Sequence, residues 1–276
     1  MTYWIHRRLV SLTAVALAIA VPVSAHALSF DQNVTPDVIF GSGNANGGFT
    51  VDTNGGLELG LRAKLRFDAA NQPQNVFNSN GDGTYSFDAT LPPTGFGFAP
   101  GSASTAIWNF EWAINTDTND ATNITLGDLV YEIQIDFDAG VGTSFLSFDP
   151  INQTYADHAI GNNATLNGAG ATAADAAAYA GLIASENVAQ NSWNMEFFDD
   201  AGAGFPFAGD ANGQYEIILS AKDSGGNLLA STQISVIAGT GAAPVPEPNA
   251  ALLFGVGLFA VGCRLRRRSP ESGSAA

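Results

Sequence analysis

The stretch LELGLRAKLRF, residues 57–67, indicates which kind of fold this chain adopts. Apolar side chains occupy its odd positions, and Glu, Gly, Arg or Lys occupies the even ones. Because successive side chains of a β-strand point to opposite faces, this period of two predicts a half-buried strand. Its outer face carries Arg62, Lys64 and Arg66, which we expect to pair with acidic side chains on a neighbouring strand, with a ligand-binding patch as the alternative.

Similar alternation recurs along the chain and predicts further strands. They are TYSFDAT (84–90), AIWNFEWAIN (106–115), LVYEIQIDF (129–137), FLSF (145–148), WNMEFF (193–198), QYEIILSA (214–221) and LLASTQISVI (228–237). The last two are joined by KDSGGN, a turn rich in Gly, Asp and Asn, which predicts a hairpin. Trp108, Phe110 and Trp112 share one face, which we interpret as the inside of a sheet rather than a sugar-binding platform.

A single helix is predicted among these strands, at ATAADAAAYAGLIA, residues 171–184, because alanine favours helix. We therefore predict an all-β fold: one β-sandwich of jelly-roll type over residues 28–240, with one short inserted helix. The chain has one cysteine, Cys263, which lies outside this domain and excludes a disulfide within it.

The first 27 residues have the pattern of a secretory signal peptide. Arg7 and Arg8 precede an apolar run at residues 9–23, and Ala25 and Ala27 supply small side chains at the cleavage positions. We expect signal peptidase to cut after Ala27; an N-terminal membrane anchor is the alternative.

A tripartite pattern follows the domain. Residues 241–249 form a linker with a rigid Pro246-Glu247-Pro248 motif, residues 250–263 are apolar, and residues 264–276 begin with a basic cluster. At about 1.5 Å per residue, 14 helical residues reach about 21 Å, short of a hydrocarbon core of about 30 Å. This predicts a transient transmembrane segment with the basic cluster in the cytoplasm. A buried hairpin or core helix is the alternative.

This tail resembles the PEP-CTERM sorting signal of exported proteins in Gram-negative bacteria. The resemblance rests on the motif residues, the apolar run and the arginine cluster: Val245, Pro246, Glu247, Pro248, Arg264, Arg266, Arg267 and Arg268. It implies that a membrane-embedded exosortase recognises the tail, cleaves near the Pro-Glu-Pro motif and transfers the protein to the cell envelope, the cell surface or the extracellular matrix. Residues 269–276 extend beyond the arginines, where many such signals end sooner.

The expected exported part is strongly acidic. Of 26 acidic residues only Glu247 and Glu271 lie outside residues 28–244, which leaves 24 against four basic ones, a net charge of −20. Such a surface repels nucleic acid, so we expect no nucleic-acid partner. It favours divalent cations or basic partners, or simply keeps the protein soluble.

Few residues point to catalysis. His158 is the one histidine left after removal of the signal peptide, which excludes a histidine-rich zinc site, and no G-x-S-x-G elbow or phosphate loop is present. The pairs Asp136–Asp138, Asp149–Asp157 and Asp199–Asp200 are the carboxylates available to a secreted glycosidase. We expect a protein that is not an enzyme, with no catalytic residue, and keep the glycosidase as an alternative.

The sequence therefore favours a structural or adhesive protein of the cell surface or biofilm matrix, associated with exopolysaccharide. A calcium-dependent carbohydrate-binding module is the second hypothesis. We expect no cofactor and no dedicated metal site; calcium is the alternative, because NSNGDG places Asn78, Asn80 and Asp82 as in a calcium loop, although Ala89 stands where such a loop needs glutamate.

Overall fold

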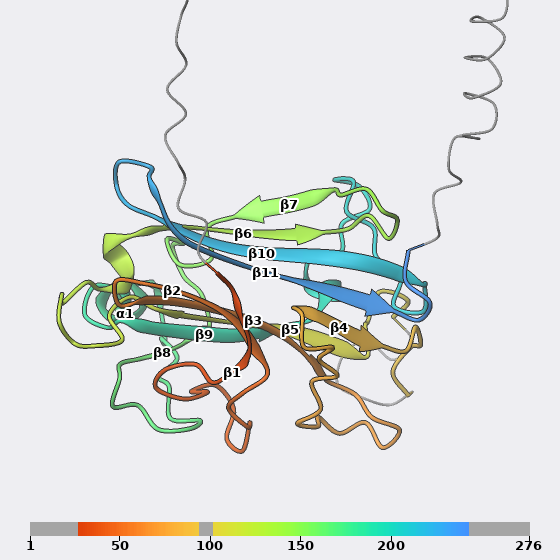
Figure 1. Ribbon diagram of the computed structural model, residues 1–276, viewed down its shortest axis with the longest axis horizontal. Coiled ribbons are helices and arrows are strands. Elements are labelled where there is room, and N and C mark those ends of the chain that lie inside the picture. Colours follow the sequence, from red (N-terminus) through yellow and green to blue (C-terminus); the bar gives the residue numbers. More distant parts are fainter. Residues whose placement is uncertain (1–26, 94–101, 243–276) are drawn as a thin grey trace, which may run out of the picture.

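The computed structural model describes residues 27–93 and 102–242. Its strands form two sheets that lie one above the other (Figure 1). The six-stranded sheet contains, in spatial order, β1 (Ser29–Gln32), β2 (Phe49–Asn54), β3 (Leu57–Leu65), β5 (Trp108–Asn115), β9 (Val188–Trp193) and β8 (Ala159–Gly161). The five-stranded sheet contains β4 (Thr84–Phe87), β11 (Leu228–Ala238), β10 (Gly213–Lys222), β6 (Val130–Asp136) and β7 (Phe145–Phe148). This confirms the all-β prediction.

The structure also shows how the strands pair, which the alternation of apolar and polar residues did not predict. Neighbours in sequence pair as antiparallel hairpins in β2–β3, β6–β7 and β10–β11, and the last of these is the predicted hairpin across residues 222–227. Strand β4, however, runs parallel to β11. The connectivity therefore differs here from a jelly roll of purely antiparallel Greek keys.

The core between the sheets is built from their facing side chains. Trp108, Phe110 and Trp112 of β5 are each at most 1% exposed, as predicted for the inside of a sheet. They belong to the same buried cluster as Ile133 and Ile135 of β6 and the apolar side chains of β10 and β11. One continuous cluster spans both sheets, so the sandwich has a single core.

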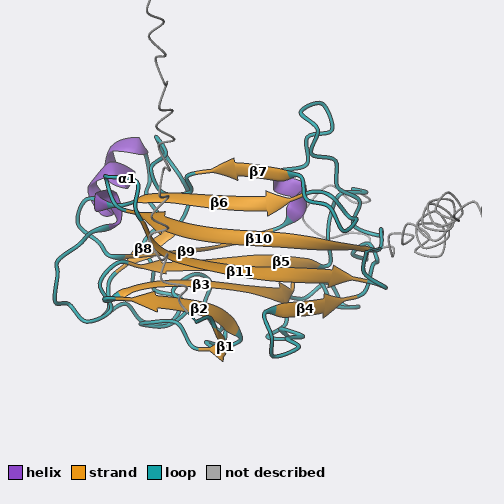
Figure 2. Cartoon of the chain, turned by 45° about the horizontal axis from the view of Figure 1, so that its top comes forward, coloured by secondary structure: helices purple, strands orange, loops and turns teal. Residues whose placement is uncertain are grey.

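The only α-helix among the described residues is α1 (Ala176–Ile183), at one end of the sandwich (Figure 2). The prediction placed it at residues 171–184. It begins later because the Asp175 side chain accepts a hydrogen bond from the Ala178 amide and so caps the first turn. Tyr179 anchors it through a hydrogen bond from its hydroxyl to the Ile151 carbonyl, 2.7 Å.

The prediction of a strand at residues 193–198 was wrong beyond Trp193, and it missed residues 188–192, which form most of β9. Asn194 ends the strand, because its amide donates to the carbonyls of Ala106 and Trp108 and its side-chain oxygen accepts from the Ala106 amide. The chain continues into a 3-10 helix, η2 (Met195–Phe197). A second 3-10 helix, η1 (Leu126–Asp128), precedes β6.

The outer face of the six-stranded sheet is covered by residues 33–48, which we call the covering loop. Val34 and Val38 of this loop pack on Phe49, Val51 and Ala113. The prediction that residues 57–67 expose their outer face was therefore wrong: every residue of β3 up to Lys64 is buried. The covering loop creates a second buried layer, and the candidate site lies within it.

Candidate functional site

Two neighbouring strands bring opposite charges together beneath the covering loop. Arg62 of β3 stands directly opposite Glu111 of β5 in the register of the sheet. The Arg62 Nε atom lies 2.6 Å from Glu111 Oε2, and both side chains are almost fully buried. The predicted cross-strand charge pair is thus confirmed.

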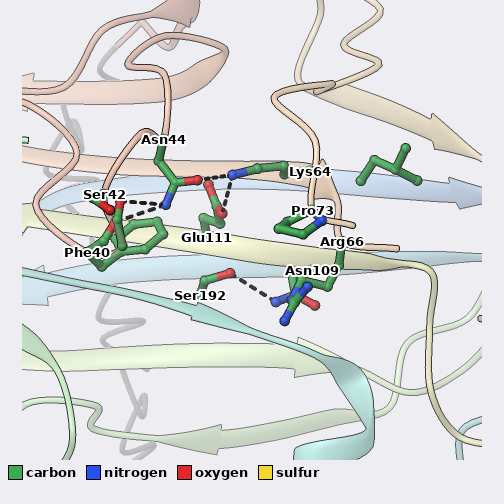
Figure 3. A pocket seen from close by; sticks show the side chains of 11 residues that line it. Phe40, Ser42, Asn44, Lys64, Arg66, Pro73, Asn109, Glu111 and Ser192 are labelled. Carbon is green, nitrogen blue, oxygen red and sulfur yellow. Dashed lines mark hydrogen bonds and ion pairs between the residues drawn. The ribbon is translucent and has the colours of Figure 1, made fainter. Parts of the chain in front are cut away.

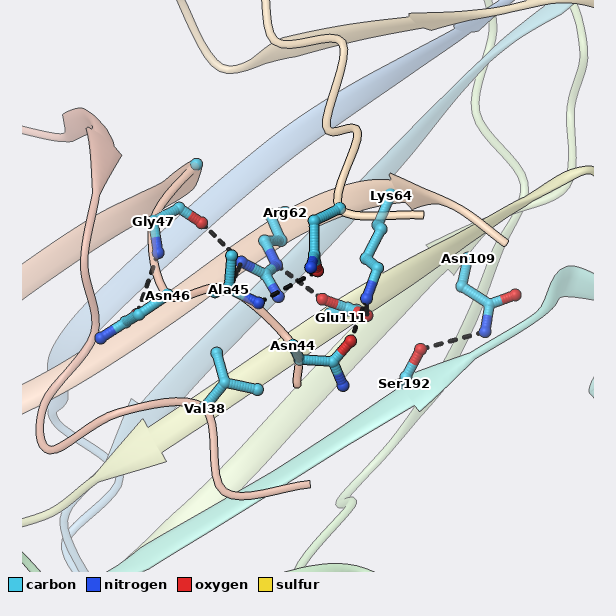
Figure 4. Close-up of polar contacts among 12 residues, drawn as sticks. Val38, Asn44, Ala45, Asn46, Gly47, Arg62, Lys64, Asn109, Glu111 and Ser192 are labelled. Atoms are coloured by element: carbon cyan, nitrogen blue, oxygen red, sulfur yellow. Dashed lines mark hydrogen bonds and ion pairs between the residues drawn. The ribbon is translucent and has the colours of Figure 1, made fainter. Parts of the chain in front are cut away.

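Arg62 is held by the covering loop and by two aromatic rings; Figure 4 shows its contacts with the loop. Its Nη1 donates to the carbonyls of Ala45 and Gly47 in the covering loop, at 2.9 and 2.6 Å. The guanidinium lies between the rings of Phe49 and Phe77, 4.2 and 4.3 Å from their centroids. Burial lowers the Arg62 pKa, and the charge of Glu111 opposes that shift. We infer that Arg62 fastens the covering loop to the sheet.

Lys64 shares the same carboxylate. Its Nζ lies 3.8 Å from Glu111 Oε1 and donates a hydrogen bond to Asn44 Oδ1 of the covering loop. Burial lowers the Lys64 pKa, Glu111 raises it, and the positive charges of Arg62 and Arg66 lower it further. Glu111 therefore supplies one negative charge to two buried cations.

Beyond Lys64 the outer face of the sheet opens into a cavity of about 260 Å³, which we call the cationic pocket. Figure 3 shows Phe40, Ser42 and Asn44 on one side and Arg66, Pro73 and Asn109 on the other. At its floor, Asn109 Nδ2 donates to Ser192 Oγ of β9 at 3.0 Å. The complete lining is Phe40, Gly41, Ser42, Asn44, Lys64, Leu65, Arg66, Pro73, Asn109, Glu111 and Ser192.

A second cavity, of about 460 Å³, lies beside the open edge of β9 and is called the aromatic pocket. Ser192 lines both pockets, so they are neighbours. The apolar wall of the aromatic pocket is formed by Phe148, Trp193, Phe197 and Phe198. Its polar rim is formed by Gln153, Asp157, His158 and Asn191. Aromatic rings beside amide and carboxylate groups are typical of sites for small polar ligands.

His158 is a structural part of the aromatic pocket. Its Nε2 lies 2.7 Å from the Pro150 carbonyl, and its Nδ1 lies 3.0 Å from Asn191 Nδ2. The ring is therefore neutral and protonated on Nε2, with Nδ1 accepting the hydrogen bond from Asn191. Burial lowers its pKa, which the Pro150 carbonyl and Asp157 partly oppose. Both ring nitrogens are therefore occupied, by the Pro150 carbonyl and the Asn191 amide.

The acidic pairs serve mainly as turn residues. Asp136 Oδ1 accepts from the amides of Asp138 and Ser144, and Asp149 Oδ1 accepts from those of Ile151 and Asn152. Aspartate side chains that accept from backbone amides two or three positions further along the chain are typical of turns.

The predicted calcium-type loop is also closed by its own contacts. Asp82 Oδ1 accepts hydrogen bonds from the Thr84 amide and hydroxyl, and Asn80 donates to Thr84 and Ser86. In the part of the chain that the structure describes, no three His, Cys, Asp or Glu side chains are grouped to hold a metal ion.

Most of the predicted sorting and cleavage residues lie outside the described residues. These are Ala25, the motif Val245, Pro246, Glu247 and Pro248, and the cluster Arg264, Arg266, Arg267 and Arg268. Ala27 is described and exposed, two positions before β1. The predicted transmembrane segment, residues 250–263, is likewise outside; within residues 27–93 and 102–242 no helix is long and apolar enough to cross a membrane.

Sequence comparison identifies the tail directly. A family model described as the PEP-CTERM protein-sorting motif matches residues 244–268. No curated protein and no solved structure matches the chain. The matched residues include the Pro-Glu-Pro motif, the apolar run and the four arginines. The chain therefore carries a PEP-CTERM protein-sorting motif, which indicates an exported protein that is processed by exosortase and sorted to the cell envelope.

Proposed function

We propose that this protein is a structural or adhesive component of the cell surface or extracellular matrix and works in contact with exopolysaccharide. The sorting motif at residues 244–268 is the observation that carries the proposal. A signal peptide at residues 1–27 starts export, the apolar segment at 250–263 holds the protein in the inner membrane, and exosortase releases it. The sandwich is then displayed outside the cell.

The sandwich supports a binding role rather than catalysis. Its one histidine is fixed by Pro150 and Asn191, and its paired carboxylates accept backbone hydrogen bonds. The net charge of −20 over residues 28–244 keeps such a protein soluble outside the cell. We propose that it is not an enzyme.

Processing of the tail is the direct test. Full-length protein is expressed in a Gram-negative host that contains an exosortase, and cell fractions are analysed by mass spectrometry of the mature C-terminus. Glu247→Ala, and separately replacement of Arg266, Arg267 and Arg268 by serine, should leave the protein unprocessed in the inner membrane. Glu271→Ala is the matched control, since it removes an acidic residue outside the motif. Unchanged processing in both motif variants would refute the proposal.

A carbohydrate-binding module is the second candidate, favoured by the aromatic pocket of about 460 Å³. A glycan array measures directly whether the protein binds carbohydrate. Running it with calcium and with a chelator separates calcium-dependent from calcium-independent recognition, and an array without any bound glycan would reject the candidate.

A further inference from the structure

The cationic pocket concentrates positive charge in an acidic protein. Arg62, Lys64 and Arg66 are three of the four basic side chains in residues 28–244, and they occupy alternate positions of one stretch. Lys64 and Arg66 both line the pocket. Repulsion from distant acidic groups is screened beyond about 8 Å at physiological ionic strength. Glu111 also lines the pocket and balances one of these three positive charges, so a ligand inside the pocket experiences a net positive charge from the nearby side chains.

The lining also matches the groups of a sugar ring. Asn109 and Ser192 offer amide and hydroxyl groups for sugar hydroxyls, and Phe40 and Pro73 offer apolar walls. A volume of about 260 Å³ is slightly below that of drug-sized ligand pockets, roughly 300–1,000 Å³. The space suits one monosaccharide unit.

The edge of β9 provides a path for a chain rather than a single sugar. Strand β8 pairs with β9 only from Val188 to Gln190, so β9 extends past its neighbour at Ser192. Ser192 lines the cationic pocket on one side and the aromatic pocket on the other. Consecutive units of an oligosaccharide can therefore occupy both pockets, one unit near Lys64 and Arg66 and the next near Phe197.

We propose that the cationic pocket binds the carboxylate of a uronic-acid unit in an acidic polysaccharide, whose neighbouring unit packs in the aromatic pocket. Arg66 offers the carboxylate a planar guanidinium and Lys64 offers a point charge. This proposal names the class of ligand, and it rests on the proposed function in contact with exopolysaccharide.

Binding is measured by calorimetry on the full-length chain, purified in detergent from a host that lacks exosortase, with galacturonate oligosaccharides and the matched neutral galactose oligosaccharides. The acidic ligand should bind at least about tenfold more tightly, and more weakly as ionic strength rises. Arg66→Gln should lower the affinity by about tenfold. Phe197→Ala should weaken oligosaccharide binding but not binding of galacturonate monosaccharide. Lys222→Gln also replaces a basic side chain by glutamine, but on β10 in the other sheet; it is the matched control and should bind as the wild type.

Several results would overturn the inference. They are equal affinity for acidic and neutral ligands, wild-type affinity in a folded Arg66→Gln protein, or no binding to either ligand. Self-association that Arg66→Gln abolishes would assign the pocket to a carboxylate of a second copy instead. Thermal unfolding checks that the variants fold, and Ser192→Ala provides a milder second variant at the junction of the pockets. Because this assay needs no exosortase, failed tail processing with intact uronate binding would refute only the proposed function.

Discussion

At the scale of single residues, the buried Arg62–Glu111 pair controls the outer layer of the sandwich. Glu111→Gln leaves the Arg62 and Lys64 charges buried without their shared carboxylate. Breaking a buried pair in this way costs about 3–5 kcal/mol of unfolding free energy. Urea unfolding measures the loss.

The exposed pair between Lys222 and Glu132 is the matched control for that experiment. It has a similar distance, 2.9 Å, but both side chains are more than one-third exposed. Glu132→Gln should therefore cost only about 0–1 kcal/mol. Equal losses in the two variants would show that burial of Arg62 does not determine the cost.

His158 should make stability depend on pH. Burial lowers its folded-state pKa below the ordinary value near 6.5, so the unfolded chain binds a proton first as pH falls. The stability that neutral His158 contributes to the folded state is complete above about pH 6.5 and is lost progressively as the pH falls below that value. The free energy of unfolding should fall more between about pH 7.5 and about pH 5 in the wild type than in His158→Gln. Parallel pH profiles would contradict this.

At the scale of elements, Gly60 shows how tightly the covering loop lies on β3. A Cβ atom at this position would lie 2.8 Å from Val34 Cγ1 and 3.2 Å from Phe49 Cδ1. Gly60→Val should therefore displace the covering loop, cost about 1–3 kcal/mol and speed proteolysis within residues 33–48. Unfolding and limited proteolysis measure these effects.

Gly181 of α1 is the control for that substitution. A Cβ atom added there meets no atom within 4 Å, and a helix favours alanine over glycine by about 0.5–1 kcal/mol. Gly181→Ala should therefore stabilise the protein and leave the protease sensitivity of the covering loop unchanged. Faster cleavage in both variants would show that the site of cleavage does not depend on the contacts of Gly60.

The elements also show which parts of the fold could be predicted from the sequence. Strands with strong alternation, such as β5, β6 and the β10–β11 hairpin, were predicted close to their true bounds, because one face of each enters the core. The short strands β1 and β8 were missed, since three or four residues carry too little periodicity, and β2 and most of β9 were missed as well. The end of β9 depends on the side chain of Asn194, which donates hydrogen bonds to Trp108 and Asn109 of β5, about 85 positions away in the sequence.

At the scale of the whole molecule, the two candidate pockets could not be predicted. The charge pair between β3 and β5 follows from strand alternation and was expected. The cationic pocket, however, combines Phe40, Lys64, Pro73 and Ser192, which come from separate parts of the chain. Their meeting depends on how the covering loop crosses the sheet, and no local pattern encodes that path. The sorting motif was predictable because it is contiguous and is recognised as a linear sequence.

Net charge is a property of the whole molecule and leads to a last prediction. With a charge of −20 over residues 28–244, acidic groups on the surface repel one another, and salt screens this repulsion. Sodium chloride should therefore raise the unfolding temperature, because exposed pairs such as Lys222–Glu132 are too few to offset the gain. Calcium chloride at matched ionic strength should have the same effect as sodium chloride if screening alone acts. A larger shift with calcium, abolished by a chelator, would instead demonstrate a specific calcium site, whereas a temperature that falls with salt would contradict the screening argument.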